Sequence, residues 1–458
     1  MVTSTRTYAS GFARVAPAPP AWWSTAAGLV AAVNALIVVV LWLSNESLSQ
    51  LTGAGGALTA LGRLTGLIAA ELLLVQVLLM ARVPGLERSY GQDRLARWHR
   101  WTGFTSFNLM LAHIGFITAG YAASDHAAVL GELWRLVTTY PGMLLATAAT
   151  AALCMVVVTS VRAARRRLRY ESWHLLHLYA YLGIALALPH ELWTGAGFVS
   201  SPLARAYWWS TYVVAAGSLV TFRLGIPVWR SLRHRLVVSH VVPEASGVVS
   251  VYLRGRHLDR LPAAPGQFFL WRFLDGPGWT RAHPYSLSAA PRPDQLRITV
   301  KDLGDGSGRV PWIRPGTRVL VEGPYGRLTR PAYDGRPVTM LACGVGITPL
   351  RALLDSLPGP ISLLYRARDA HDVVFREELD EAAARGRVRV GYLIGPRASA
   401  DSWVPVGHRS DRLGVWVPGI AQHHVYVCGP DAWMAAAIRA AENAGVPRER
   451  IHSERFTW

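Results

Sequence analysis

Six long apolar runs fill the N-terminal half of the chain, and each is close to the roughly 20 residues that a helix needs to cross a bilayer. The first run is too long to be the core of a signal peptide. The pattern therefore predicts a bundle of six transmembrane helices. The runs lie at residues 22–43, 59–81, 98–120, 140–161, 173–192 and 206–226.

The pattern changes after the basic linker RLGIPVWRSLRHR. Short alternating segments such as GVVSVYLRG and QLRITVKDLG follow, separated by Gly and Pro turns, which is typical of a small antiparallel β-barrel. From about Arg336, apolar strands alternate with helices, which predicts a doubly wound α/β sheet with ligands at its strand ends. A multi-domain membrane protein is thus predicted. Its parts are a cytoplasmic tail at 1–20, a six-helix transmembrane domain at 21–228, a β-barrel domain at 233–332 and an α/β domain at 336–458.

Charge follows this predicted topology. The formal net charge is +18, from 47 basic and 29 acidic residues, and the arginines crowd the segments at 82–100, 162–169 and 223–235. By the positive-inside rule, the N-terminus and everything after the sixth run are cytoplasmic. Nucleic-acid binding therefore has little support, and three cysteines offer neither a disulfide framework nor a zinc spacing. The preference for arginine over lysine is typical of a high-GC bacterial genome. Together with the topology, it predicts a multi-pass protein of the plasma membrane whose first partner is the lipid bilayer.

Histidines recur at matched spacing in two of the apolar runs. His99 and His113 are fourteen residues apart, a rise of about 21 Å and nearly four full turns, so both rings face about the same way. His177 and His190 are thirteen apart in the fifth run, which travels outward like the third. Ionisable side chains at membrane depth are costly and usually functional, and neutral imidazole is a standard axial ligand of haem iron. The four histidines predict two stacked b-type haems and an electron path across the bilayer.

Two details of the fifth run stay open. Thirteen residues are about 3.6 turns, so His190 would lie off the face of His177 in an ideal helix, although Pro189 could kink or unwind that turn. His174, one turn before His177, is a rival inner ligand. We prefer His177, and helical geometry alone does not decide.

Two other polar residues lie within the runs. Arg63 enters the second run at about the depth of the outer haem, where it could neutralise a propionate, hold an acceptor or snorkel to the interface. Glu71 lies in the middle of the same run and is expected to form a hydrogen bond across the bundle.

Four short motifs of the C-terminal half fall where the predicted folds place their ligands. HPYSLS, at 283–288, ends a strand with an aromatic ring flanked by hydroxyl groups, which suits stacking on a flavin. The glycines and Ser307 of VKDLGDGSG lead to a helix start, where free N–H groups receive a pyrophosphate. CGVGITP, at 343–349, joins a strand to a helix through glycines that let the backbone approach a phosphate. VCGPD places Cys428 and Gly429 at the same rim of the sheet.

The order of HPYSLS, VKDLGDGS, EGPYG, CGVGITP, VCGP and a C-terminal ERFTW resembles the ferredoxin–NADP reductase family. The preceding helices with paired histidines resemble the ferric reductase and NADPH oxidase superfamily. The two motif sets are independent, and together they cover nearly the whole chain beyond its first twenty residues. The resemblance implies a barrel that binds FAD, an α/β domain that binds NADPH and a membrane domain that binds two haems b.

The resemblance also implies roles for individual residues. FAD would be held by His283, Pro284, Tyr285, Ser286, Lys301, Gly304 and Ser307, with Tyr285 and Ser286 at the isoalloxazine. NADPH would lie along Gly344, Gly346, Thr348 and Pro349, with Cys428 and Gly429 near the nicotinamide. Phe456 would cover the flavin face until nicotinamide displaces it, and Trp458 offers a second aromatic ring for that role. Cys428 and Phe456 are thus the expected catalytic residues, and His99, His113, His177 and His190 are the expected metal ligands.

The choice of nicotinamide cofactor rests on the segment after SLLY. An acid there commonly binds the ribose hydroxyls of NADH, whereas the additional phosphate of NADPH calls for arginine. Arg366 and Arg368 precede the first acid, Asp369. This order favours NADPH, and Asp369 keeps NADH open.

Hydride carries two electrons, haem iron accepts one at a time, and flavin handles both, which explains why the three cofactors occur together. The chain is predicted to pass electrons from cytosolic NADPH through FAD and two haems to an external acceptor. A ferric chelate or other metal is favoured over dioxygen, because Ile117 stands where oxygen-reducing members commonly carry a histidine. Arg63, which resembles a basic residue of those enzymes, keeps dioxygen open, as does a protein acceptor. The alternative is a membrane-anchored flavin reductase that serves a soluble electron-transfer protein such as a ferredoxin.

Overall fold

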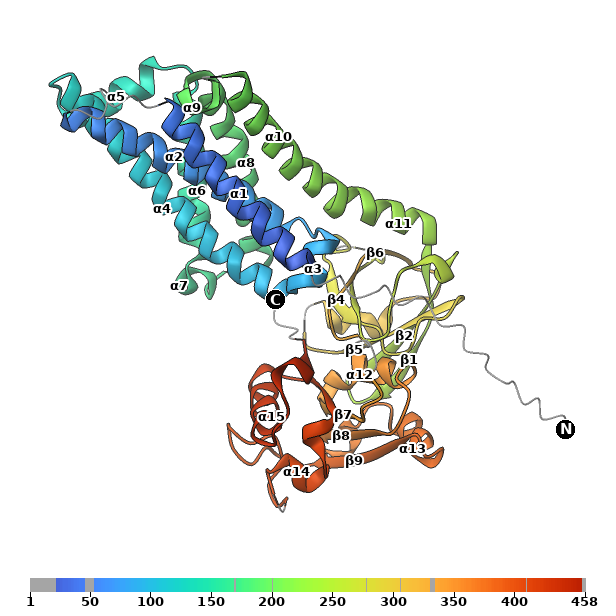
Figure 1. Cartoon of the computed structure of the whole chain (residues 1–458). Coiled ribbons are helices and arrows are strands. Elements are labelled where there is room, and N and C mark those ends of the chain that lie inside the picture. Colours follow the sequence, from blue (N-terminus) through green and yellow to red (C-terminus); the bar gives the residue numbers. More distant parts are fainter. Residues whose placement is uncertain are drawn as a thin grey trace. The chain divides into compact units, whose positions relative to one another are not determined.

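A computed structural model of the chain divides it into two compact units, one at Ala21–Phe222 and one that begins at Arg223. The first is helical, and the second carries the strands (Figure 1). The boundaries predicted for the separate domains stay predictions. The structure describes residues 22–45, 53–168, 170–199, 201–276, 278–304, 306–329, 334–408 and 410–454.

The first unit contains several helices with the length and composition of membrane spans. Five segments qualify: Thr25–Ser44, Ala54–Met80, Met143–Ser160, Ser172–Thr194 and Pro202–His234. The predicted third run lies inside a longer helix, Gln92–Ser124, which is not among the five because polar residues such as Thr102, Ser106 and Asn108 interrupt it. The predicted count of six spans is therefore not confirmed. The helices are α1 (Trp22–Asn45), α2 (Ala54–Met80), α3 (Pro84–Tyr90), α4 (Gln92–Ser124), α5 (Val129–Thr139), α6 (Met143–Ser160), α7 (Arg162–Arg165), α8 (Tyr170–Thr194), α9 (Ala196–Val199) and α10 (Pro202–Leu219).

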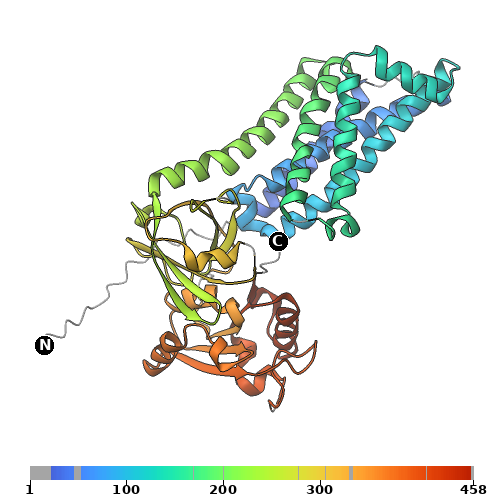
Figure 2. The same ribbon diagram turned by 180° about the vertical axis from the view of Figure 1, so that it is seen from behind.

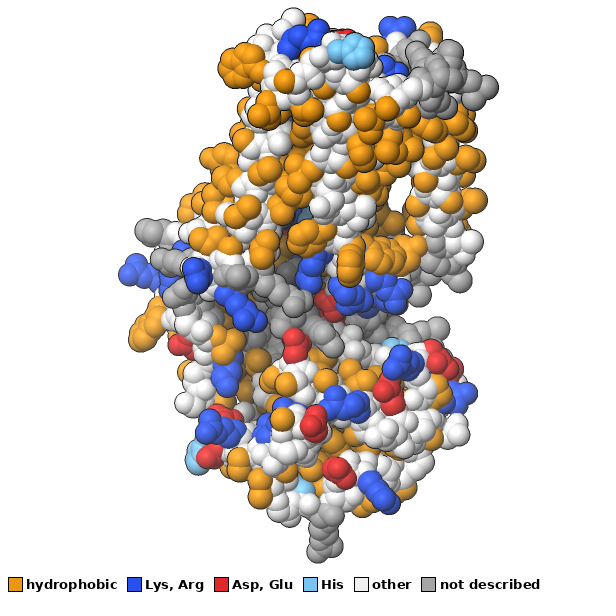
Figure 3. All heavy atoms as spheres, turned by 90° about the vertical axis from the view of Figure 1, so that its left-hand side faces the viewer, with side chains coloured by type: hydrophobic (Ala, Val, Ile, Leu, Met, Phe, Trp, Pro, Cys, Tyr) orange, Lys and Arg blue, Asp and Glu red, His pale blue; other side chains and the backbone are white. Residues whose placement is uncertain are grey.

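Two long helix pairs organise this unit. Helix α2 lies beside α4, and α6 lies beside α8 (Figures 1 and 2). Many outward side chains are apolar, and Figure 3 shows hydrophobic side chains spread over the visible face of the helices, with charged side chains gathered towards the helix ends. An apolar surface of this extent is unfavourable in water and suits contact with lipid.

The second unit begins with a helix and an antiparallel sheet. The π-helical turn Val220–Gly225 continues α10 into α11 (Ile226–His234), and the sheet has the strand order β4-β3-β6-β1-β2-β5. The antiparallel sheet was predicted and is observed. A closed barrel is not confirmed, because in the described part of the chain the two edge strands are joined by a single isolated bridge, between Leu287 and Ile298, and not by a ladder of hydrogen bonds. The strands are β1 (Leu236–Ala245), β2 (Val248–Arg254), β3 (Phe268–Phe273), β4 (His283–Ser286), β5 (Gln295–Lys301) and β6 (Arg318–Tyr325), with 3-10 turns at Leu258–Arg260 and Ser307–Trp312.

The C-terminal part is a parallel sheet with helices on both faces, as predicted. Its strand order is β11-β10-β7-β8-β9, and every residue of β7 is buried. Met340 of β7 packs in a core with α12 and α13, whereas its neighbour Leu341 packs on the other face with α14 and α15. This alternation is what a strand covered on both faces requires. The elements are β7 (Val338–Cys343), α12 (Ile347–Leu354), β8 (Ile361–Ala367), α13 (Arg376–Ala384), β9 (Val388–Ile394), α14 (Leu413–Trp416), β10 (His424–Cys428), α15 (Asp431–Asn443) and β11 (Ile451–Ser453), with 3-10 turns at Gly344–Gly346, Ala370–Asp372, Ile420–Gln422 and Arg448–Arg450.

Candidate functional site

The four histidines of the membrane unit lie as two pairs between α4 and α8. The ring centroids of His99 and His177 are 5.9 Å apart, and those of His113 and His190 are 6.4 Å apart. An imidazole nitrogen binds a metal at about 2 Å, so two rings on opposite sides of one metal have centroids about 6 Å apart. The observed spacing fits an iron between each pair of rings.

Hydrogen bonds to Nδ1 orient three of these rings. Nδ1 of His113 lies 2.7 Å from the carbonyl oxygen of Gly62. Nδ1 of His177 lies 3.2 Å from Oγ of Ser160, and Nδ1 of His190 lies 2.8 Å from Oγ1 of Thr194. Partners of this kind fix the orientation of a ligating ring and leave Nε2 for the metal.

The geometry of α8 bears on the two details that the sequence leaves open, the position of His190 and the choice between His174 and His177. Pro189 lies inside the helix, and His190 still reaches His113. The ring of His177 lies 5.9 Å from that of His99, between centroids, and also stacks on Trp173 at 5.1 Å, whereas the ring of His174 lies 6.5 Å from Trp173.

Glu71 forms hydrogen bonds across the bundle. Its carboxylate accepts a bond from Asn34 of α1 and a bond of 3.1 Å from the Tyr207 hydroxyl of α10. Arg63 is half-buried in α2, next to Gly62, whose carbonyl contacts His113.

In the second unit, β4 presents the HPYS residues on a short strand beside β3. His283 and Tyr285 are two residues apart in β4, so their side chains lie on the same face of the strand. Their rings stack, with centroids 5.9 Å apart. The Trp271 indole fixes this strand by donating a 2.9 Å bond to the carbonyl of Tyr285, and Ser286 is buried. Burial raises the pKa of Tyr285, so its hydroxyl stays protonated at neutral pH.

The GDGS turn lies against β4. A Cβ atom at Gly306 would lie 2.1 Å from the His283 ring, so this close approach requires glycine. Ser307 closes the turn, because its Oγ accepts from the Leu303 N–H at 2.8 Å and donates to the Gly304 carbonyl at 3.0 Å. Thus the turn that Ser307 closes with Gly304 meets His283 through Gly306, although these residues come from two motifs.

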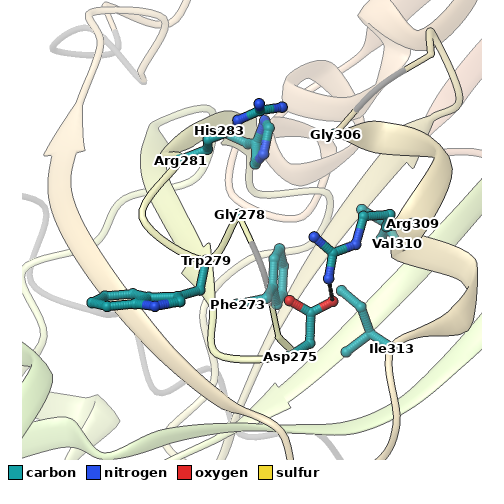
Figure 4. Close-up of a pocket in the computed structure, with 10 residues that line it drawn as sticks. All are labelled: Phe273, Asp275, Gly278, Trp279, Arg281, His283, Gly306, Arg309, Val310 and Ile313. Carbon is teal, nitrogen blue, oxygen red and sulfur yellow. Dashed lines mark hydrogen bonds and ion pairs between the residues drawn. The ribbon is translucent and has the colours of Figure 1, made fainter. Parts of the chain in front are cut away.

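A pocket of about 250 Å³ opens beside this contact (Figure 4). Its lining combines an exposed indole, Trp279, with the basic side chains of Arg281 and Arg309. Arg309 forms a 3.0 Å ion pair with Asp275, which the dashed line in Figure 4 marks. None of these residues was predicted, and only Trp279 and Arg281 have a signal in the sequence, the GWTR stretch just before HPYS. The full lining is Phe273, Asp275, Gly278, Trp279, Arg281, His283, Gly306, Arg309, Val310 and Ile313.

The nucleotide motifs meet at the ends of β7 and β10. A Cβ at Gly346 would lie 2.4 Å from the Cys428 carbonyl oxygen, so the turn into α12 and the end of β10 are in direct contact. Thr348 and Pro349 form the first turn of α12, where the Thr348 hydroxyl donates to the Val345 carbonyl at 2.6 Å. A phosphate at this rim would meet the N–H groups that begin α12.

The thiols at this rim are neutral at physiological pH. Burial raises the pKa of Cys343, which hydrogen bonding from Arg366 opposes, and burial raises the pKa of Cys428 well above its ordinary value. Neutral, buried thiols are poor nucleophiles. Arg366, Arg397 and Lys301 all lie close enough to Cys343 to act on its charge, so the rim is basic.

Of the residues predicted to choose between NADPH and NADH, Arg366 faces inward. Its Nη1 lies 3.5 Å from Sγ of Cys343, and its Nη2 donates to the Gly395 carbonyl at 3.2 Å. Arg368 and Asp369 are exposed in the following loop, where Asp369 accepts a bond from the His371 ring.

A cluster of charged residues joins the antiparallel sheet to the α/β sheet. Glu378 of α13 accepts hydrogen bonds from Arg297 of β5 through both carboxylate oxygens and from Arg351 of α12 at 2.6 Å. Arg297 also donates to the Ser288 carbonyl at 2.7 Å, just after β4. Burial opposes the charge of Glu378, but the two arginines outweigh burial and lower its pKa. One carboxylate therefore binds the helix that begins at the nucleotide turn, through Arg351, and the segment just after HPYS, through Arg297.

The predicted residue Phe456, with Trp458, lies outside the described residues. The last described residue, Glu454, accepts bonds from the N–H groups of Arg327 and Leu328 at 3.2 and 3.3 Å.

Comparison with known proteins gives matches to both units. The family model of the ferric reductase like transmembrane component matches residues 65–188, and that of the oxidoreductase NAD-binding domain matches residues 340–439. Ferredoxin–NADP reductase B of Sorangium cellulosum is 31% identical over 235 residues, which are 45% of this chain and 93% of that protein. The flavohemoprotein of Bordetella pertussis is 32% identical over 257 residues, which are 50% of this chain and 60% of that protein.

Among solved structures, the flavohem-like FAD/NAD-binding domain of nitric oxide dioxygenase from Vibrio cholerae is 26% identical. It covers 48% of this chain and 98% of that chain, with a TM-score of 0.42. The chain spans less than two thirds of the flavohemoprotein and nearly all of the reductase.

Proposed function

Since this chain belongs to the ferric reductase and NADPH oxidase superfamily, we propose that it transfers electrons from cytosolic NADPH across a membrane to an external acceptor. FAD and two b-type haems are the proposed cofactors. The observation that carries the proposal is the pairing of four imidazoles from α4 and α8, at 5.9 and 6.4 Å between ring centroids. Two pairs of imidazole rings, each spaced to hold one metal ion, would form an electron path along these helices.

The residues of the membrane unit would hold and orient the haems. His99 with His177 and His113 with His190 would bind the two irons, and Gly62, Ser160 and Thr194 orient three of the rings. When bound, FAD takes up hydride as an electron pair and releases single electrons, which haem iron carries.

We assign the isoalloxazine of FAD to the face of β4 that carries Tyr285. The pyrophosphate is assigned to the contact between His283 and the GDGS turn. The neighbouring pocket then takes the adenosine part, with Trp279 offering a stacking surface and Arg281 and Arg309 offering positive charge.

NADPH is assigned to the rim formed by Gly344, Gly346, Thr348 and Pro349, with Cys428 and Gly429 at the nicotinamide. The inward position of Arg366 leaves the exposed Arg368 as the residue to bind the ribose phosphate. The buried Cys428 is neutral, so at the nicotinamide it would occupy space and keep water out without carrying charge.

For the acceptor, we propose a ferric chelate or another oxidised metal complex. Arg63 follows Gly62, whose carbonyl contacts His113. On the proposed outer side of the bundle, its positive charge would attract an anionic chelate. Dioxygen is the competing small acceptor.

An anaerobic absorption spectrum of the purified protein in detergent tests the proposal. We expect a low-spin b-haem spectrum that NADPH reduces when FAD is bound. Bleaching of the flavin without any haem band would show that the helices are only an anchor.

That outcome would favour the second candidate, a membrane-anchored flavin reductase serving a soluble electron-transfer protein. Its support is the ferredoxin–NADP reductase that this chain covers over 93% of its length. The haem spectrum separates the two candidates, because an anchor needs no metal ligands.

A further inference from the structure

In helix α11, the buried face is polar and the exposed face is apolar, which is the reverse of a surface helix in contact with water. Its buried positions are polar: the Ser231 hydroxyl accepts from the Val321 N–H at 3.0 Å, and Nδ1 of His234 lies 3.0 Å from the Arg256 carbonyl. Its exposed positions are large and apolar, with Val228 56%, Trp229 54% and Leu232 67% exposed. A helix that faced water would carry polar residues at these positions.

The apolar positions form one continuous face. Val228, Trp229 and Leu232 are spaced as neighbours on a helix surface, and Leu224, one turn earlier, is also exposed. Leaving this area in water costs about 25 cal/mol per Å². Something other than water therefore covers the face in the working protein.

The length of the continuous helix indicates what covers this apolar face. A single helical segment runs from Pro202 to His234, 33 residues long. At 1.5 Å per residue, it measures about 50 Å, whereas the hydrocarbon core of a bilayer is about 30 Å thick. The last turns of this segment, which are α11, therefore reach the headgroup region.

The charges beside the face fit a lipid surface. The Arg233 guanidinium lies 5.1 Å from the centre of the Trp229 ring, and Arg235 is exposed directly after the helix. A tryptophan and arginines bordering an apolar stripe are typical of helices that lie in the membrane interface. Arginine also binds phosphate groups through two parallel hydrogen bonds.

We propose that α11 rests on the cytoplasmic leaflet, with Val228, Trp229 and Leu232 at the boundary of headgroups and acyl chains and with Arg233 and Arg235 on anionic phospholipid headgroups. Ser231 bonds the opposite face to β6 of the proposed flavin sheet, so the lipid contact also holds that sheet. This surface goes beyond the proposed function, since it requires a membrane but neither haem nor an acceptor.

Spin labelling of the full-length protein in nanodiscs tests the contact. A nitroxide is attached at Leu232→Cys in a Cys154→Ala background, since Cys343 and Cys428 are buried. The control label is at Val415→Cys, an exposed apolar position of α14. We expect the Leu232 label to collide several-fold less with a water-soluble nickel chelate than the control and more with dissolved oxygen.

The other outcomes overturn the proposal. Equal nickel accessibility at both sites places the face in water. Protection from both nickel and oxygen indicates a protein cover, from this chain or a second copy.

A second experiment tests the headgroup contact by comparing nanodiscs of phosphatidylcholine with nanodiscs containing phosphatidylglycerol. We expect the Leu232 label to lie deeper in the anionic membrane and Arg233→Gln with Arg235→Gln to remove this difference. Arg385→Gln, an exposed arginine of another face, serves as the matched control. Equal depth of the unsubstituted protein in both membranes would overturn the assignment to anionic lipid. The readout needs no turnover, so it stays interpretable if the proposed electron path fails.

Discussion

The two units of this protein carry their proposed chemistry in different ways. In the membrane unit, it rests on four side chains that two helices place in pairs. In the second unit, the nucleotide site rests largely on backbone at the ends of β7 and β10, where Gly346 allows a close approach. The helix bundle would supply side chains that bind a metal, whereas the edge of the sheet would supply backbone groups that form a cradle around a nucleotide.

This difference decides which sequence signals are informative. A histidine in an apolar run is costly, so its spacing alone carries information. A glycine turn is common in any α/β protein, so a single turn says little and the order of several motifs is needed. Substitutions of a single histidine in the membrane unit and of a single glycine in the second unit test this contrast.

The largest effect is expected from removing one outer ligand. His113→Ala would leave the proposed outer haem site with one imidazole, so we expect loss of about half of the low-spin haem absorbance and loss of electron transfer across the membrane. NADPH should still reduce the flavin. His126→Ala, at an exposed histidine after α4, is the control. Equal spectra for the two variants would contradict the ligand assignment, and loss of the inner haem in His174→Ala would reassign the inner pair.

The next largest effect is expected at the nucleotide cradle. The added Cβ of Gly346→Ala would lie 2.4 Å from the Cys428 carbonyl and force β7 and β10 apart. We expect a loss of about 1–3 kcal/mol in the stability of the second unit and much weaker NADPH binding, with the haem spectrum unchanged. Thermal unfolding and a nucleotide titration measure both.

Gly414→Ala is the matched control for this cradle, because a Cβ there meets nothing within 4 Å. If both variants bind NADPH like the unsubstituted protein, the rim does not hold the nucleotide.

The sequence predicts much of this arrangement, and the failures have physical causes. The spacing of His99 and His113 predicts their common helix face, but the spacing of His177 and His190 does not, because Pro189 lies within that turn. The count of six spans is not confirmed, because α4 mixes polar residues with its apolar ones and does not meet the composition of the other five segments. Arg366 is expected at the ribose phosphate but faces Cys343, since side-chain direction depends on the neighbouring strands. No periodicity connects Arg297 of β5 with Glu378 of α13, because the two residues are distant in sequence.

A smaller effect is expected from the carboxylate that joins the two sheets. Glu378→Gln keeps the side-chain size and removes the charge that holds Arg297 and Arg351. We expect hydride transfer from NADPH to flavin to slow by about tenfold, with little change in NADPH affinity. Stopped-flow reduction under anaerobic conditions measures the rate. Glu381→Gln, which removes an exposed ion pair within the same helix, should leave it unchanged.

The same carboxylate predicts a pH dependence. The pKa of Glu378 is lowered in the folded chain, so its ion pairs stabilise the second unit fully above the ordinary value of 4.5, and this stabilisation is lost as pH falls through the lower folded value. We expect the difference in unfolding midpoint between the unsubstituted chain and Glu378→Gln to shrink below about pH 4.5. A constant difference across this range would mean that the contact does not depend on the charge of Glu378.

The smallest effect is expected in the pocket beside β4. Trp279→Ala removes the stacking surface proposed for adenine but leaves His283 and the GDGS turn in place, so FAD should bind about threefold more weakly. Fluorescence of released FAD during dilution measures this loss. Trp312→Ala is the matched control, because Trp312 is 83% exposed and does not line the pocket. Because a cradle made of backbone tolerates the loss of one side chain, a loss of FAD as complete as the loss of haem expected for His113→Ala would show that this site depends on side chains as strongly as the membrane unit does.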